Sequence, residues 1–432
     1  MEVTIVSKKL VKPTSPTPQK HRNLPISCID QLAYSTYVPV ILYYATGGGG
    51  DAAEEASQRK KQLEESLARI LNIYYPLAGR YICDKHMIDC NDEGAELSET
   101  KVNNKLSHLM SGSFPVDKLN FLVSYGFESP TSPLLTIQLN EFDCGGIAIG
   151  ITFAHKIMDG ISMVEFIRGW STACSQGIDK LQHYPSFQLA SLFPARDGSL
   201  VVRPSARKQE IVKIVTKRFL FNEERIRTLR DLASSGNGGE SGSLGGRFSR
   251  GQVVTALIWM VFTRIYEANS KRNLRSFLLT QPANMRDKVK IPKPQNSFGN
   301  FVIESNAKFV PANGEGNVNF SELVHFLRDT IASTINQCAE AREDDLVANV
   351  ENKLKEGTCV NEDVDICRFS SWCNMPFYEA DFGWGTPIWV SSVEIPRHKF
   401  ALLLDTKDGN GIEAWVSLEE NVMPFFEKNS EI

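Results

Sequence analysis

The chain has 432 residues, 42% hydrophobic and 23% charged, which is enough for two or three domains with cores of their own. Its formal net charge is −4, and it has no block of lysine and arginine suited to a phosphate backbone, so nucleic acid is not expected as a partner. No run approaches the ~20 apolar residues that span a bilayer, and the N-terminus lacks an apolar signal segment. The sequence therefore predicts a cytoplasmic protein without a membrane partner.

The nine cysteines are scattered through the chain, and none forms a Cys-x-x-Cys pair. The odd number and the absence of a signal segment predict reduced thiols. The histidines are isolated as well, and no His/Cys cluster has the spacing of metal ligands. No metal site is therefore expected.

The first part of the chain alternates between expected strands and helices. A strand is expected at 3–10 and a buried one at 38–45, before a helix at 56–73. The helix is expected to turn one apolar face to the core, formed by Leu63, Leu67, Ile70 and Leu71. Between these elements, the four-glycine run at 47–50 predicts a hairpin tip, since no Gly-Lys-Ser/Thr follows to form a phosphate loop.

His155 follows an apolar, β-favouring run at 147–154 and precedes a helical-looking stretch at 162–173. It is therefore expected where a strand ends and a turn begins, a common place for chemistry held by a scaffold. An imidazole titrates near neutral pH and can take a proton from a bound alcohol or amine. These features make His155 the candidate general base.

The second part of the chain begins after an irregular, proline-containing stretch at 185–213. Helices are expected at 223–233 and 249–266, with a Gly/Ser-rich internal loop at 234–246 between them. The acidic stretch at 340–365 is typical of a solvated helical face and loop.

Two distant motifs together resemble those of the plant BAHD acyltransferase family: His155-x-x-x-Asp159 and the Asp-Phe-Gly-Trp-Gly sequence at 381–385. Further matches are Tyr-Pro-Leu-Ala-Gly-Arg at 75–80, Phe-Gly-Asn at 298–300 and Ser-Trp at 371–372. The segments 15–18 and 29–32 are most similar to the vinorine synthase branch, whose members acetylate hydroxyls of alkaloids and other specialised metabolites. The resemblance extends over nearly the whole chain.

The resemblance implies an α/β fold of two chloramphenicol-acetyltransferase-like domains with mixed sheets and helices, and an active site at their interface. We place the N-terminal acyltransferase domain at 1–190, the crossover linker at 191–215 and the C-terminal domain at 216–432. The resemblance also implies a monomer with no bound cofactor. Its substrates would be acetyl-CoA, or another acyl-CoA, and a small-molecule alcohol.

In the implied reaction the alcohol attacks the thioester directly, with His155 as the base, a role worth ~10²–10⁴-fold in rate. The chain has no Gly-x-Ser-x-Gly elbow that would suggest an acyl-enzyme. By resemblance, Asp159 turns away from His155 and forms a structural salt bridge with Arg286. A triad, in which Asp159 would orient His155, is the alternative.

Asp381 is grouped with His155 as a residue that catalysis requires. We expect Asp381 to act by supporting the local structure, away from the reacting atoms. The family places the 381–385 segment away from the reacting atoms, where it supports the fold and the coenzyme A channel. Gly383, Trp384 and Gly385 are accordingly coenzyme A candidates. A kinase Asp-Phe-Gly motif is excluded, since no His-Arg-Asp loop accompanies it.

Three further residues match family positions. Ser370 and the indole of Trp372 resemble residues on the side of the oxyanion, where donors stabilise the developing charge. Ser249 matches a position that contacts the pantetheine arm of coenzyme A. The alternative for the first pair is core packing plus a surface hydroxyl.

Three rival functions stay open. An N-acyltransferase would form an amide from an amine, and a catalytically silent binding protein would use the same fold. A condensation domain of peptide synthetases shares the His-x-x-x-Asp-Gly loop but usually has two adjacent histidines, whereas Ala154 precedes His155 here.

Overall fold

The computed structural model describes residues 1–46, 52–111, 114–125, 131–196, 212–235, 248–269, 276–291, 296–310, 319–358 and 364–432. The chain divides into two compact units. The first comprises Met1–Val201, Pro292–Phe301 and Met375–Val393, and the second comprises Val202–Ile291, Val302–Asn374 and Glu394–Ile432. Each unit is therefore built from segments that are far apart in the sequence.

The first unit contains a six-stranded sheet in the order β1-β6-β7-β8-β3-β13. Its strands are β1 (Glu2–Val11), β3 (Tyr37–Tyr44), β6 (Ala95–Asn103), β7 (Leu135–Phe142), β8 (Ile147–Ala154) and β13 (Trp389–Ser391). β6 and β7 are parallel, and the other neighbouring strands are antiparallel. Every residue of β8 is buried, and its sequence is apolar apart from Thr152, as expected for a strand inside the sheet.

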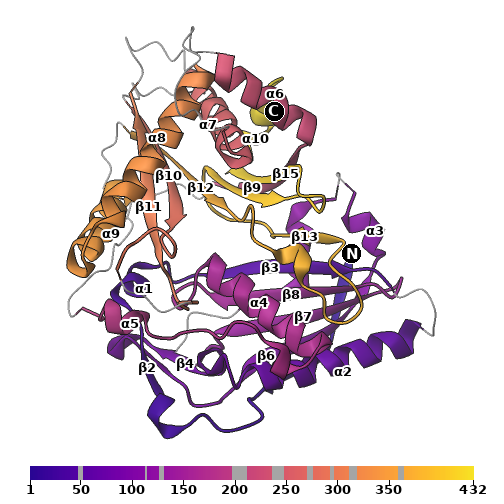
Figure 1. Ribbon diagram of the computed structural model, residues 1–432. Helices are drawn as coiled ribbons and strands as arrows, with labels where there is room; N and C mark the ends of the chain where they lie inside the picture. Colours follow the sequence, from indigo (N-terminus) through magenta and orange to yellow (C-terminus); the bar gives the residue numbers. More distant parts are fainter. Residues whose placement is uncertain are drawn as a thin grey trace. The chain divides into compact units, whose positions relative to one another are not determined.

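Two long helices of the first unit, α2 (Ala52–Ile70) and α4 (Gly160–Ser175), pack against each other (Figure 1). The four apolar residues predicted from the helical period are fully buried, which confirms that stripe as core: Leu63, Leu67, Ile70 and Leu71. Trp170 of α4 donates its indole N–H to Oγ of Ser66 in α2 at 3.0 Å. The helix pair is thus joined by a buried hydrogen bond as well as by apolar packing.

The other elements of the first unit are short. A three-stranded sheet in the order β2-β5-β4 consists of β2 (Asn23–Pro25), β4 (Arg80–Ile82) and β5 (Met87–Asp89). The short α-helices are α1 (Cys28–Leu32), α3 (Leu106–Leu109) and α5 (Leu189–Leu192). The 3-10 helices are η1 (Gln19–His21), η2 (Tyr75–Ala78), η3 (Cys83–Lys85), η4 (Val116–Leu122), η5 (Ile178–Lys180) and η7 (Phe377–Glu379).

The second unit also contains a six-stranded sheet, in the order β11-β10-β12-β14-β15-β9. Its strands are β9 (Ile214–Phe221), β10 (Ser276–Asn284), β11 (Val302–Phe309), β12 (Val364–Ser371), β14 (Phe400–Asp405) and β15 (Ile412–Glu419). β12 runs parallel to both of its neighbours, and the remaining pairs are antiparallel. Both units therefore have sheets of mixed orientation, as the predicted α/β class requires.

The helices of the second unit are α6 (Glu223–Ser235), α7 (Arg250–Asn269), α8 (Phe320–Ala339), α9 (Glu343–Thr358) and α10 (Met423–Glu427). α6, α7 and α8 pack together, and α9 lies beside β11 (Figure 1). α7 is buried on nearly all sides, including every residue from Val253 to Phe262. A helix that is apolar all round belongs in a core, and α7 contributes much of the core of this unit.

Most elements expected from the sequence are present with bounds shifted by a few residues. The strand at 147–154 has the predicted bounds, and the other strands and helices predicted in chain order correspond to β1, β3, α2, α4, α6 and α7. The acidic stretch forms α9 and leads into β12. The predicted hairpin tip at 47–50 and most of the predicted loop at 234–246 lie outside the described residues.

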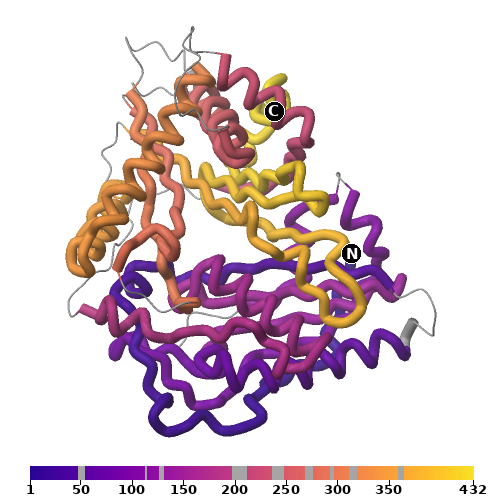
Figure 2. The backbone as a smooth tube through the Cα atoms, viewed as in Figure 1, coloured from indigo at the N-terminus to yellow at the C-terminus, as the bar shows by residue number. Residues whose placement is uncertain are grey.

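The two units are not two contiguous halves. The segment Met375–Val393 belongs to the first unit because β13 pairs with β3, with Trp389 opposite Tyr43. Figure 2 shows this orange segment running beside the indigo tube of β3. The domain bounds 1–190 and 216–432 place that segment in the C-terminal half and stay a prediction, and residues 197–211 of the predicted linker lie outside the described part.

The described residues include no helix long and apolar enough to cross a membrane. Eight of the nine cysteines are described, and none of these eight is joined to another in a disulfide. Cys359 is the ninth and lies outside the described residues. Within the same described ranges, no three His, Cys, Asp or Glu side chains gather as metal ligands would.

Candidate functional site

His155 lies in the turn that follows β8, at the point where the chain leaves the sheet. Its backbone N–H donates to the carbonyl of Thr36 at 2.8 Å. Its own carbonyl accepts a hydrogen bond from Nδ2 of Asn300, also at 2.8 Å. Both partners come from outside the turn, so distant segments fix the backbone of His155. A fixed backbone at a partly exposed histidine is the arrangement that a positioned base requires.

Asp159 directs its carboxylate into the scaffold of this loop. Oδ1 accepts the backbone N–H of Ser162 at 3.0 Å, which makes Asp159 the N-cap of α4. Oδ2 accepts the backbone N–H of Phe301 at 3.0 Å. The negative charge also complements the positive end of the dipole of α4. These contacts support a structural role for Asp159.

Arg286, the predicted ion-pair partner of Asp159, lies in the second unit just after β10. Its backbone N–H and Nη1 both donate to Oδ1 of Asn284, at 3.1 and 3.2 Å. The pairing with Asp159 stays a prediction, because the two residues belong to different units.

The 298–301 segment contacts the His155 loop at several points besides Asn300 and Phe301. Oγ of Ser162 donates to the carbonyl of Gly299 at 3.0 Å and accepts the Gly299 N–H at 3.1 Å. Gly299 has a φ of 130°, and a Cβ there would lie 2.9 Å from Cδ1 of Leu189, so glycine is required. The sequence marked 298–300 only as a family match. Its single physical signal was a Gly-Asn pair between two phenylalanines.

Asp381 shapes its own turn. Its Oδ1 accepts the backbone N–H groups of Gly383 and Gly385, at 2.8 and 2.9 Å. Both glycines have positive φ values, 111° and 100°, in a region that side-chain-bearing residues rarely adopt. The carboxylate therefore holds a turn that only these glycines adopt readily, which supports the expectation that Asp381 acts through architecture.

An aromatic cluster surrounds this turn. The rings of Phe382 and Trp384 stack with centroids 5.9 Å apart, and Phe382 meets Trp170 of α4 edge-on at 4.8 Å. The guanidinium of Arg59, in α2, lies 5.4 Å from the Trp384 ring. The turn is thus packed against both long helices of the first unit. Contact of Gly383, Trp384 or Gly385 with coenzyme A stays a prediction.

Tyr44 of β3 adds a buried hydrogen bond to the same segment. Its hydroxyl donates to the carbonyl of Ala380 at 2.8 Å. Burial, together with the charge of Asp381, raises the pKa of Tyr44 well above its ordinary value. The hydroxyl therefore stays protonated at neutral pH and remains a hydrogen-bond donor.

Ser370 and Trp372 lie at the end of β12 in the second unit. Ser370 pairs with Leu402 of β14, and the backbone N–H of Trp372 donates to the carbonyl of Leu403 at 2.8 Å. Because they are two positions apart on an extended segment, their side chains share one face. A hydroxyl and an indole N–H on one face suit an oxyanion, and that role stays a prediction.

Ser249 caps helix α7. Its backbone N–H donates to Oε1 of Gln252 at 2.9 Å, and its Oγ accepts the Gln252 N–H at 3.1 Å. This reciprocal pair is a capping box, which satisfies two amides at the start of the helix. The hydroxyl keeps its proton for another acceptor. Contact with the pantetheine arm is a prediction that this geometry leaves open.

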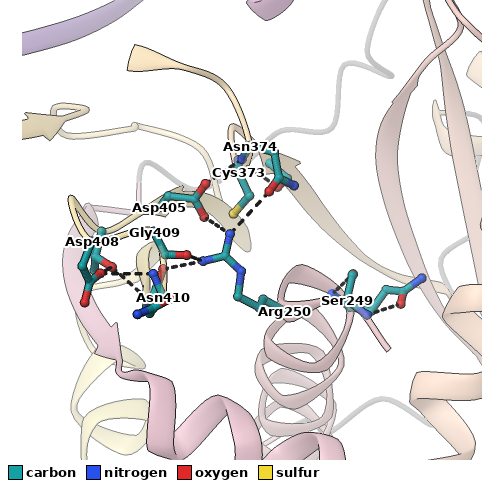
Figure 3. Close-up of polar contacts among 12 residues, drawn as sticks. Ser249, Arg250, Cys373, Asn374, Asp405, Asp408, Gly409 and Asn410 are labelled. Carbon is teal, nitrogen blue, oxygen red and sulfur yellow. Dashed lines mark hydrogen bonds and ion pairs between the residues drawn. The ribbon is translucent and has the colours of Figure 1, made fainter. Parts of the chain in front are cut away.

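Arg250, the first residue of α7, joins the helix to two loops (Figure 3). Its Nη2 lies 3.0 Å from Oδ1 of Asp405 and 3.4 Å from Oδ1 of Asn374, while Nη1 donates to the carbonyl of Gly409. Burial, with Asp405 nearby, raises the pKa of Cys373 to about 12, so this thiol stays protonated. No pattern in the sequence predicted this cluster, because a lone arginine in a first helical turn is ordinary.

Comparisons with known proteins agree over the full length. The family described as the transferase family matches residues 1–432. Vinorine synthase of Rauvolfia serpentina is 33% identical, over 97% of this chain and 94% of the relative. Acetyl-CoA-benzylalcohol acetyltransferase of Clarkia breweri is 32% identical, over 100% and 99%. Pelargonidin 3-O-(6-caffeoylglucoside) 5-O-(6-O-malonylglucoside) 4'''-malonyltransferase of Salvia splendens is 32% identical, over 100% and 99%.

A solved structure extends the likeness from sequence to fold. The crystal structure of vinorine synthase matches with a TM-score of 0.81 at 30% identity, covering 98% of this chain and 96% of the other. The predicted α/β acyltransferase fold is confirmed by this match, as is the resemblance to the vinorine synthase branch.

Proposed function

Because the chain belongs to the BAHD family of plant acyltransferases, we propose that it transfers an acyl group from coenzyme A to a hydroxyl of a specialised metabolite. The enzyme class, an acyl-CoA-dependent acyltransferase, follows from the family. We propose acetyl as the acyl group. One relative is named for acetyl-CoA and an alcohol, while another is a malonyltransferase, so the acyl group varies among relatives.

The geometry of the His155 loop carries the proposal. Thr36 and Asn300 hold the backbone of His155, whereas both carboxylate oxygens of Asp159 accept backbone amides of the scaffold. A carboxylate committed to two amides is poorly placed to act as the base. His155 is therefore the group we assign to proton transfer.

In the proposed reaction, His155 takes the proton of the acceptor hydroxyl as its oxygen attacks the thioester carbonyl carbon. The tetrahedral intermediate collapses, the carbon–sulfur bond breaks, and the ester is released. The proton passes from His155 to the departing coenzyme A sulfur. Both substrates must be bound together, and no acyl group becomes attached to the protein.

The test is acceptor-dependent thiol release. The purified protein is incubated with acetyl-CoA or malonyl-CoA and a panel of hydroxylated and aminated plant metabolites, and product masses are measured. We expect release with acetyl-CoA and an alcohol, a product heavier by one acetyl group, and sequential kinetics. An amide product would favour the N-acyltransferase instead. Ping-pong kinetics, or an acyl adduct on the protein after incubation with acyl-CoA alone, would overturn direct attack.

A further inference from the structure

Asp30 is a buried carboxylate to which the proposed reaction assigns no role. It lies in α1 and is 4% exposed. Its Oδ2 accepts the backbone N–H and Oγ–H of Ser27, at 3.0 and 2.6 Å, while the Asp30 N–H donates to Ser27 Oγ at 3.1 Å. This capping box uses only one oxygen of the carboxylate.

The other oxygen reaches a segment 270 residues away in the sequence. Oδ1 of Asp30 accepts both the backbone N–H of Asn300, at 2.7 Å, and its Nδ2, at 2.9 Å. Four donors thus converge on the carboxylate, a set that suits its ionised, acceptor-only form. Burial raises the pKa of Asp30, and the four donors oppose that rise.

The side chain of Asn300 connects Asp30 to His155. Its Nδ2 carries two hydrogens, one directed to Asp30 and the other to the carbonyl of His155 at 2.8 Å. Both neighbours of Nδ2 are acceptors, so the orientation of the amide is fixed. The chain of contacts therefore runs from a buried charge, through one amide group, to the backbone of the proposed base.

Lys156 makes a second connection between the same two regions. Its ammonium donates to the carbonyls of Gln31 and Ala33, at 3.0 and 2.7 Å. These carbonyls lie at the end of α1, where helices leave carbonyls without intrahelical partners. The His155 loop is thus attached to α1 at two consecutive residues, once directly and once through Asn300.

We propose that Asp30 is a positioning residue for His155, acting through the side chain of Asn300. This role rests on the proposed function of His155 as the base. A base must keep hydrogen-bond distance to the acceptor hydroxyl, and a displacement of about 1 Å costs roughly 100-fold in rate. Asp30 sets this distance by locating the carbonyl, and with it the Cα, of His155.

Asp30→Asn and Ser27→Ala separate positioning from helix capping. In Asp30→Asn, one side of the residue becomes an NH₂ group and cannot accept from both Ser27 and Asn300. Ser27→Ala removes the hydroxyl of the cap and leaves Oδ1 bound to Asn300. We expect Asp30→Asn to lower kcat by about 10–100-fold with KM for acyl-CoA nearly unchanged, and Ser27→Ala to change kcat by less than about threefold. Equal losses of kcat in the two variants, or none in Asp30→Asn, would overturn the proposal.

A double-mutant cycle tests the route through Asn300. Asn300→Ser keeps Asp30 and its cap but is too short to reach the His155 carbonyl. If Asp30 acts through Asn300, the double variant loses no more kcat than Asn300→Ser alone, whereas independent effects would multiply. Should Asp30→Asn not yield folded protein, Asn300→Ser alone decides, and retention of wild-type kcat in it would overturn the proposal.

His155→Ala distinguishes this inference from the proposed function. If His155→Ala is inactive while Asp30→Asn retains wild-type kcat, His155 remains the base and only the positioning role fails. If His155→Ala retains wild-type turnover, the proposed function itself fails.

Discussion

Two aspartates of the first unit, Asp159 and Asp381, use the same functional group in different ways. Asp159 accepts one amide three residues away and another 142 residues away, so it joins distant segments beside His155. Asp381 accepts amides two and four residues away, and these two hydrogen bonds hold its own turn. Because of this difference, loss of Asp159 should disturb the contact of two segments. Loss of Asp381 should disturb a turn that aromatic packing also supports.

Among these variants, His155→Ala should give the largest loss of kcat, against which the losses in the two aspartate variants can be compared. Proton transfer alone is removed, so kcat should fall by ~10²–10⁴-fold while the fold is kept. The measurement is thiol release at neutral pH together with a melting curve. His108→Ala is the matched control, because His108 is exposed and its ring forms a hydrogen bond with Asn104, four residues away. More than about a tenth of wild-type kcat in His155→Ala would contradict the assignment of a general base.

Asp159→Ala should give the next largest effect, now on stability. Both oxygens are lost, and the buried amides of Ser162 and Phe301 lose the carboxylate that accepts them, which should cost about 2–4 kcal/mol of unfolding free energy. Asp159→Asn retains one acceptor and should cost less. Urea unfolding measures both, and kcat of the folded fraction should fall as well. A wild-type unfolding midpoint for Asp159→Ala would show that the carboxylate does not join the two segments.

Asp381→Asn should have a smaller effect. A single oxygen of Asp381 accepts both glycine amides, and asparagine keeps one such oxygen, so the loss should stay below about 1 kcal/mol. Asp381→Ala removes the acceptor and should cost more. The readouts are the melting temperature and acyl-CoA binding. If Asp381→Asn leaves both unchanged while kcat alone collapses, Asp381 is a direct catalytic group and does not act through its turn.

The smallest effect should be the pH dependence of the unfolding free energy that arises from His398 in the second unit. Burial, then the charges of Lys399 and Arg368, lower its pKa from 6.5 to about 4. The unfolded chain therefore binds a proton at higher pH than the folded one. The unfolding free energy that His398 contributes is fully present above about pH 6.5 and is lost as the pH falls toward 4. The side chain is 35% exposed, so screening weakens the effect.

His398→Gln removes this titration and provides the check. Its unfolding midpoint in urea should fall less than that of the wild type between pH 7 and pH 4.5. Identical pH dependence of the two proteins would show that His398 does not carry the effect. The stabilities of the Asp159 and Asp381 variants should be compared at a pH above this titration, where His398 does not change its charge.

Local patterns predicted the centre of the site well. The mostly apolar run at 147–154 predicted β8, and the polar turn after it placed His155 ahead of α4. Those features are visible because each involves neighbouring residues. The contacts of Asn300 and Phe301 with this loop were not predicted, since no periodicity connects residues separated by more than 140 positions.

The strand order shows the same limit. β13 has only three residues, and its pairing with β3 left no recognisable strand pattern, so the linear domain scheme placed it in the other half. The capping box of Ser249 and Gln252 was readable from the Ser-x-x-Gln spacing. The family resemblance directed attention instead to a ligand contact at Ser249.

The late position of β13 has a consequence for biosynthesis. Tyr43 of β3 and Ser391 of β13, which share a buried hydrogen bond, are 348 residues apart. At ~5–20 residues per second, the ribosome needs roughly 17–70 s to supply the second after the first. Until then β3 is an open sheet edge, and exposed edges promote pairing with other chains. Nascent chains that stall before residue 389 should therefore be the species that chaperones bind and that aggregate first.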